Sequence, residues 1–411
     1  MPIALILVDA LSPTYVSRST LPSIVDLARD GFTGPLANLY AYRGIEATLF
    51  TGRFPSEHGV WGEFRPSLGA ERASDRLMRL MIRAGDLLPA DRLRFDARYI
   101  AHRLNRSHQP LPTVNLIPPR LLSRFSRSVE TPIGQPGSLG LHRTLFDELR
   151  AARRPFELVG YPVVGRDEQI VPHVRMRLHQ ADRPDFWYIK FSALDTLGHR
   201  YGPDTLRLGP ALAKLDRQLA ELFAMLQSAY PGGEIDLIVV SDHGMSRVSR
   251  TFDIRPLLKR ANLELGRDYL YFLDSTTIRM WSESQRVLEA FARCLADQPD
   301  LRILDADARA GLHLPDDDSS GDLLVALDEG NVVFPDFFRR QTPPAGMHGY
   351  AFVQSPSGLP FLAVGPALAA LLPSDRRLSH VDVWALMRRR LNLAERRDAQ
   401  LANESVCTFS S

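Results

Sequence analysis

Short apolar runs that alternate with amphipathic stretches constrain the fold of this chain more than any other feature. Five runs are apolar at nearly every position, as expected of strands buried on both faces: residues 3–8, 156–159, 186–191, 235–240 and 361–364. Helical patterns lie between them at residues 21–29, 141–152, 210–228 and 380–391. Because strands and helices alternate, we predict an α/β fold with a central, mostly parallel sheet covered by helices on both faces.

Two long segments interrupt this alternation. Residues 65–140 carry an Arg-rich amphipathic pattern followed by a Pro-rich stretch, and we predict a cap inserted over the strand ends. The alternative is a solvent-exposed helical insertion without a catalytic role. Residues 250–340 contain their own strand and helix patterns, which predict a small accessory α+β segment. The sequence therefore predicts one domain over residues 1–395 and a C-terminal tail over residues 396–411.

Composition excludes several classes of protein. Fifty basic and 48 acidic side chains among the 411 residues leave a formal charge of only +2, so we expect no nucleic-acid polymer as a partner. Cys294 and Cys407 are too few for a disulfide framework or a thiolate metal site. No run has the roughly 20 apolar residues of a membrane span, and the first residues do not resemble a signal peptide. We therefore expect a cytoplasmic protein without stable membrane insertion, of unknown oligomeric state.

Carboxylates and imidazoles collect where the predicted strands end, and most of them have glycine neighbours. In open α/β sheets, ligands bind at the carboxyl ends of the strands. Three carboxylates and three imidazoles suit two divalent ions of the zinc or manganese kind, and such a pair can clamp a phosphoryl group. We expect a small-molecule, glycan-linked or lipid-linked phosphate ester as substrate. The six candidate metal ligands are Asp9, Asp195, His199, Asp242, His243 and His348.

The motifs around these residues resemble the type I phosphodiesterase/nucleotide pyrophosphatase branch of the alkaline phosphatase superfamily. The resemblance implies a three-layer sandwich with one ion held by Asp195, His199 and His348, and the other held by Asp9, Asp242 and His243. The motifs that carry it are Asp195-x-x-Gly198-His199-x-x-Gly202-Pro203, Asp242-His243-Gly244-Met245, His348-Gly349, and the block from Thr51-Gly52 to His58-Gly59.

The position of the nucleophile departs from the pattern of that branch. The resemblance implies a Thr or Ser at the N-terminus of the helix that precedes Thr51-Gly52, but the corresponding position is Tyr42, with Arg43 beside it. Tyr42 is either a metal-bound tyrosinate that attacks phosphorus or a pocket wall beside an attacking metal-bound hydroxide. Tyr40 and Thr48 are the nearby alternatives.

A second departure is Glu63, which stands where the branch has an asparagine that contacts the phosphoryl group. Glu63 either faces the substrate or faces solvent. A carboxylate at the substrate repels phosphate unless it is paired. Arg43 could neutralise it, or could itself bind the phosphate.

The sequence as a whole predicts a two-metal phosphoric ester hydrolase, either a phosphodiesterase or a nucleotide pyrophosphatase. The alternatives are a phosphomonoesterase, phosphonate hydrolase or phosphomutase relative, or a non-catalytic protein that keeps the ions and binds a phosphorylated ligand. We interpret His58 as a structural hydrogen-bonding residue and the remaining histidines, His380 among them, as surface or capping groups.

Overall fold

The computed structural model describes residues 1–41, 44–67, 80, 84, 87, 117–118, 121, 124–129, 131–160, 165–260, 263–296 and 298–393. Most of the predicted cap at 65–140, and all of the predicted tail at 396–411, lie outside these residues.

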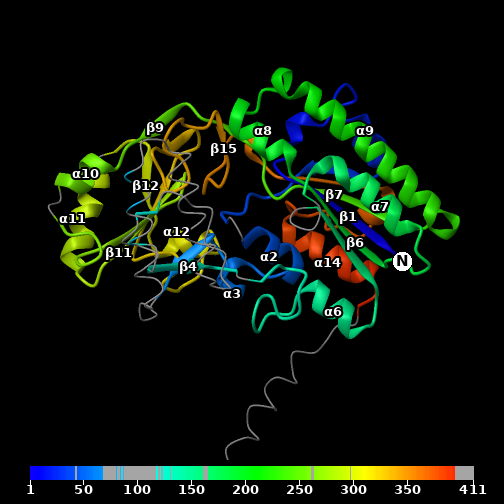
Figure 1. The fold of residues 1–411 in the computed structure, drawn as a ribbon, viewed down its shortest axis with the longest axis horizontal. Helices are drawn as coiled ribbons and strands as arrows, with labels where there is room; N and C mark the ends of the chain where they lie inside the picture. Colours follow the sequence, from blue (N-terminus) through cyan, green and yellow to red (C-terminus); the bar gives the residue numbers. More distant parts are fainter. Residues whose placement is uncertain are drawn as a thin grey trace, which may run out of the picture.

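A six-stranded sheet forms the centre of the larger part of the molecule (Figure 1). Its strand order is β2-β16-β7-β1-β6-β5. The four strands β7, β1, β6 and β5 run parallel, whereas β16 is antiparallel to both of its neighbours. The predicted mostly parallel sheet is therefore confirmed. The strands span β1 (Ile3–Val8), β2 (Phe32–Pro35), β5 (Phe156–Gly160), β6 (Phe186–Phe191), β7 (Asp236–Val240) and β16 (Phe361–Val364).

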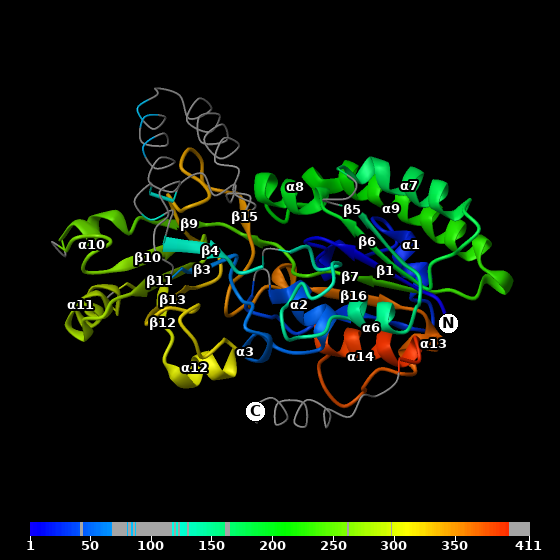
Figure 2. The ribbon, with the colours of Figure 1, turned by 60° about the horizontal axis from the view of Figure 1, so that its bottom comes forward.

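Helices cover both faces of this sheet, which gives three layers (Figure 2). Successive side chains of β1 point to opposite faces, so Ile6 packs under the helices of one layer and Leu5 under those of the other. Both are fully buried, and a buried aliphatic side chain of this size contributes about 1.5–3 kcal/mol. One layer contains α1 (Pro22–Leu27), α7 (Ile170–Leu178), α8 (Ala193–Tyr201) and α9 (Thr205–Ala229); the other contains α2 (Gly44–Thr51), α6 (Leu145–Ala151) and α14 (His380–Arg390).

Capping residues explain where two helices begin. The Thr144 side chain accepts a hydrogen bond from the Asp147 backbone N–H, and the helix predicted from residue 141 therefore begins at Leu145. Asp204 caps α9 in the same way, so this helix begins before Pro210 and includes it. The hydrophobic pattern located both helices, while the caps fixed their first residues.

A second, four-stranded sheet lies beside the larger part of the molecule (Figure 1). It has the order β10-β11-β13-β12, and every strand pair in it is antiparallel. Arg279 on β11 is fully buried beneath it, where it pairs with Asp274 and donates to the Phe64 carbonyl at 2.7 Å. The elements of this accessory part are α10 (Arg255–Arg260), β10 (Leu270–Leu273), β11 (Thr277–Trp281), α11 (Gln285–Ala296), β12 (Leu301–Ile303), α12 (Ala306–Gly311) and β13 (Leu323–Leu327).

In the described part of the chain, three short strand pairs lie outside the two sheets. β8 pairs with β15, β9 with β14, and β3 with β4. Among the described residues, no helix combines the length and apolar character needed to cross a membrane. The remaining elements are α3 (Pro55–His58), β3 (Phe64–Pro66), β4 (Phe125–Arg127), β8 (Ser246–Arg247), β9 (Arg250–Phe252), β14 (Asn331–Val333), β15 (Gly346–Met347) and α13 (Pro366–Ala369).

Candidate active site

The predicted metal ligands converge at the carboxyl ends of the inner strands of the central sheet. Asp9 directly follows β1, and Asp242 and His243 lie just after β7. The sequence also suggested that Asp195 follows a strand, but β6 ends at Phe191 and Asp195 lies in the first turn of α8. Residues separated by up to 339 positions in the sequence thus meet at one place in the fold.

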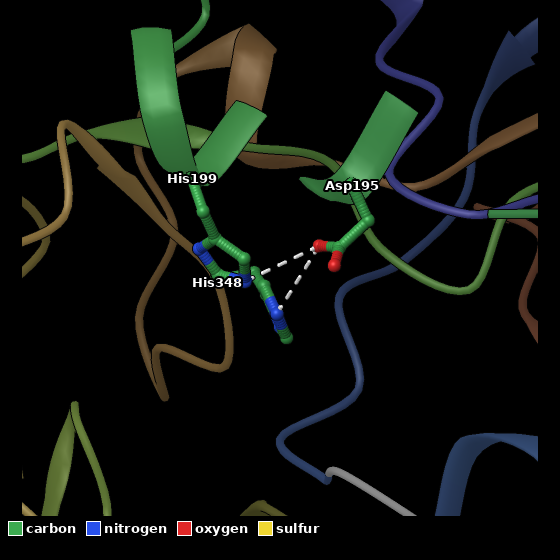
Figure 3. Close-up of side chains that lie close together, drawn as sticks. All are labelled: Asp195, His199 and His348. Atoms are coloured by element: carbon green, nitrogen blue, oxygen red, sulfur yellow. Dashed lines mark ion pairs between the residues drawn. The ribbon is translucent and has the colours of Figure 1, made fainter. Parts of the chain in front are cut away.

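Three of these residues form a first triad, made of Asp195, His199 and His348 (Figure 3). Asp195 and His199 are one turn apart on α8 and therefore share a face of the helix. The Oδ1 atom of Asp195 lies 3.4 Å from Nε2 of His199 and 3.5 Å from Nε2 of His348. The three ligand atoms are close enough together to hold one ion.

Two glycines allow this approach of α8 to β15. A Cβ atom on Gly346 would lie 2.5 Å from the carbonyl oxygen of Gly198, and a Cβ atom on Gly198 would lie 2.7 Å from the Met245 side chain. A side chain at Gly346 would force the helix and the strand apart, whereas a side chain at Gly198 would displace the Met245 side chain. The glycines in the motifs therefore bring His199 and His348 together.

Asp195 also belongs to a second triad, with Asp9 and His243. Nε2 of His243 lies 3.5 Å from Oδ1 of Asp9 and 3.8 Å from Oδ2 of Asp242. The rings of His243 and His348 stack at a centroid distance of 3.6 Å, so the two triads adjoin each other. Asp242 is held next to the second triad by hydrogen bonds from the backbone N–H groups of Ala10 and His243.

The hydrogen bonds around the histidines suit metal ligands. Nδ1 of His199 donates to the Gly346 carbonyl, and Nδ1 of His243 donates to the Gly244 carbonyl, both at 2.9 Å. Each bond fixes the proton on Nδ1 and leaves the lone pair of Nε2 facing the carboxylates. Oδ1 of Asp195 is buried and accepts no hydrogen bond from the described residues. The donor set therefore fits a pair of divalent cations.

Burial and like charges shift the pKa values at this site. Burial, together with the repulsion from Asp242, raises the pKa of Asp9 well above its usual range. Burial also lowers the pKa of His348 well below that of free imidazole, and the charges of His243 and His199 add to this effect. His348 is consequently neutral at pH 7, which is the form that binds metals. A divalent cation would offset the repulsion among the carboxylates.

Lys190 lies beside the second triad, although no sequence motif indicated it. Its Nζ atom lies 3.6 Å from Oδ2 of Asp9 and 3.1 Å from Oε1 of Glu46 on α2. The Tyr188 hydroxyl also donates to Glu46, at 2.7 Å. The carboxylates of Glu46 and Asp9 raise the pKa of Lys190 although burial opposes them. The only sequence signal was a rare lysine near the end of a buried strand.

The predicted nucleophile Tyr42 and its neighbour Arg43 lie outside the described residues. The two alternative hydroxyls have other partners. Tyr40 is buried, and its hydroxyl lies 2.5 Å from Oγ1 of Thr277. Thr48 is buried inside α2, where its hydroxyl lies 3.1 Å from Nε2 of His58. Both hydroxyls therefore take part in hydrogen bonds within the fold.

Glu63 lies between α3 and β3, where the larger part meets the accessory sheet. Its backbone carbonyl accepts a hydrogen bond from Ser128 at 3.0 Å. Its charge contributes to the pKa of Asp274, which burial raises to about 6. The half-buried Glu63 is thus close to the Asp274–Arg279 ion pair, and its role toward substrate stays a prediction.

Two further histidines have structural roles. Nδ1 of His58 accepts a hydrogen bond from the Val60 backbone N–H at 3.1 Å, which agrees with the role we interpreted from the sequence. His380 was wrongly interpreted as a surface or capping group. It is fully buried, and its Nε2 donates to the Ser241 carbonyl at 2.9 Å, directly before Asp242. His380 was missed because nothing in the local sequence places α14 behind this loop.

Comparison with known proteins identifies the family of the chain. Residues 3–351 match the model of the type I phosphodiesterase / nucleotide pyrophosphatase family. The chain belongs to this family. The resemblance inferred from the motifs is therefore confirmed, and with it the metal dependence that is general for the family.

The individual relatives share only low sequence identity with this chain. Human ectonucleotide pyrophosphatase/phosphodiesterase family member 5 is 24% identical over 201 residues, which cover 48% of this chain and 40% of that protein. The bis(5′-adenosyl)-triphosphatase of Bos taurus is 26% identical over 198 residues, or 47% of this chain and 41% of that protein. The chain thus matches less than half the length of these relatives.

Solved structures confirm the fold. The murine ectonucleotide pyrophosphatase/phosphodiesterase 5, as an inactive variant in complex with AMP, superposes with a TM-score of 0.68 at 17% identity. The match covers 97% of this chain and 96% of that chain. The predicted alkaline phosphatase-like α/β architecture is therefore confirmed.

Proposed function

We propose that this protein hydrolyses phosphodiester or pyrophosphate bonds in small nucleotide substrates, with two zinc or manganese ions at the edge of the central sheet. The observation that carries the proposal is the shared position of Asp195, whose carboxylate belongs to both triads. Bound side by side, the two ions would polarise a phosphoryl group and stabilise its charge. Family membership and the AMP bound to the murine relative support a nucleotide substrate.

The residues of this chain would each contribute a defined part. His199, His243 and His348 would each offer a ring nitrogen to the metal ions. The carbonyls of Gly346 and Gly244 fix the orientation of the His199 and His243 rings. This arrangement requires little reorganisation when a substrate binds. Zinc and manganese accept this mixed set of nitrogen and oxygen ligands more readily than magnesium or calcium.

A substrate panel tests the proposal. Purified protein supplied with zinc or manganese should turn over bis-p-nitrophenyl phosphate and ATP faster than p-nitrophenyl phosphate, and should leave p-nitrophenyl sulfate intact. The Asp195→Asn variant should lose this activity, whereas Asp26→Asn, an exposed carboxylate paired with Arg18, should keep it. Preferential cleavage of the monoester would identify a phosphomonoesterase. Activity that persists in Asp195→Asn would contradict the two-metal site.

A second candidate function is a metal-binding protein that binds a phosphorylated ligand without turnover. It is favoured by Tyr42, which stands where the family resemblance implies a Thr or Ser nucleophile. Turnover that is lost in Tyr42→Phe would assign attack to this hydroxyl and exclude a binding-only role. Turnover that survives the change would instead indicate direct attack by an activated water. The cytoplasmic location expected from the sequence stays a prediction.

A further inference from the structure

Helix α8 carries two candidate metal ligands, but the residue before it does not cap it. The side chain of Ser192, at the N-cap position, makes no capping hydrogen bond. Asp195 is the third residue of the helix, so the two residues have the spacing of a capping box. In a capping box, the acidic third residue turns back and accepts a hydrogen bond from the backbone N–H of the N-cap residue. Such a bond would occupy the carboxylate that the first triad requires.

Two other helices of this chain form a capping box with an aspartate at the same position. In α6, the Asp147 carboxylate accepts a hydrogen bond from the Thr144 backbone N–H at 3.0 Å. In α14, the Asp382 carboxylate accepts from the Ser379 backbone N–H at 2.7 Å. The local sequence of α8 therefore favours the same bond, from the backbone of Ser192 to Asp195.

Asp167, from a distant part of the sequence, takes the place of that bond. The backbone N–H of Ser192 donates to both carboxylate oxygens of Asp167, at 3.0 and 3.1 Å, and the N–H of Ala193 donates to Oδ2 at 2.9 Å. The Asp195 carboxylate points instead toward the imidazoles, with Oδ1 3.4 Å from Nε2 of His199 (Figure 3). The start of α8 is thus capped without Asp195.

The segment that carries Asp167 is anchored to the neighbouring helix. Asp167 begins a short 3-10 helix, η3 (Asp167–Gln169), which leads into α7. Its backbone carbonyl accepts a hydrogen bond from Nε2 of Gln218 on α9 at 2.9 Å, and Glu168 pairs with Lys214 on the same helix. Because α9 also packs against α8, the carboxylate of Asp167 is held at the start of α8.

We propose that Asp167 is a positioning residue, which caps α8 in place of Asp195 and thereby leaves the Asp195 carboxylate free to bind metal. Without Asp167, the backbone N–H of Ser192 would lack its acceptor, and Asp195 would turn back to supply one. This inference rests on the two-metal site of the proposed function and adds a residue that belongs to neither triad.

Zinc affinity, measured by competition with a chelating dye, tests the proposal without turnover. Asp167→Ala should weaken zinc binding by about 10-fold or more, as expected when a group that orients a ligand is lost. Asp167→Asn should recover most of the affinity, because an amide oxygen at the position of Oδ2 accepts from both N–H groups. Asp305→Ala is the matched control: it removes the carboxylate that caps α12 in the accessory part, and should leave zinc binding unchanged.

A crystal structure of the metal-free Asp167→Ala variant provides a second readout. It should show the Asp195 carboxylate accepting a hydrogen bond from the Ser192 backbone N–H. A carboxylate that still faces His199, or zinc affinity equal to that of the wild type, would refute the role of Asp167, as would an equal loss of affinity in Asp305→Ala. If the wild type binds no zinc, the proposed function fails, while the metal-free structure still decides whether Asp167 directs Asp195.

Discussion

His58 makes the stability of this protein depend on pH in a way that can be calculated. The ring is buried between α2 and the following loop, where Nδ1 accepts from Val60 and Nε2 therefore carries the proton toward Thr48. Burial lowers the pKa of His58 from 6.5 to about 4, with a contribution from the charge of His142. Protonation would also remove the acceptor that Val60 needs. The folded state thus requires the neutral ring.

The sign and size of the effect follow from these values. Because the pKa of His58 is lower in the folded state, its stabilising effect is complete above pH 6.5 and is lost as the pH falls toward 4. The shift corresponds to roughly 3 kcal/mol in total, of which about 2 kcal/mol is lost by pH 5. His58→Asn places an amide oxygen near Nδ1 as an acceptor but does not titrate.

Urea unfolding with chelator present, from pH 7.5 to pH 4.5, measures this difference. The free energy of unfolding of the wild type relative to His58→Asn should fall by about 2 kcal/mol between pH 7 and pH 5. His179→Asn, an exposed position on the same molecule, serves as the control and should follow the wild type. A difference between wild type and His58→Asn that does not change with pH would refute the reasoning.

Three further predictions concern the site and its scaffold. Asp195→Asn should lower the affinity for both ions by more than about 10-fold, measured by metal analysis after dialysis, and loss of only one ion would contradict a shared ligand. Lys190→Met should destabilise the fold by about 2 kcal/mol, since it leaves the partly buried carboxylate of Glu46 without its cation, and adding Glu46→Gln should restore part of the loss in urea unfolding. Gly52→Ala should cost more than about 1 kcal/mol, because φ is +66° and the new Cβ would lie 2.2 Å from the Trp384 ring; an unchanged melting temperature would contradict this.

Local sequence determined the elements of the central sheet. The predicted strands at residues 3–8, 186–191 and 361–364 coincide with β1, β6 and β16, because a strand buried on both faces needs a continuous apolar run that is visible in the sequence itself. The motifs also carried the candidate ligands, since the glycines that permit close backbone approach stand next to them in the chain. Family and fold class could therefore be predicted without coordinates.

Only the tertiary structure determines which candidate ligands meet and which other residues contact them. Asp195 meets His348 because α8 packs against β15, and Lys190 reaches Asp9 because β6 lies next to β1. These contacts join residues that are distant in sequence, and their charges act through space over a few ångströms, so no local pattern records them.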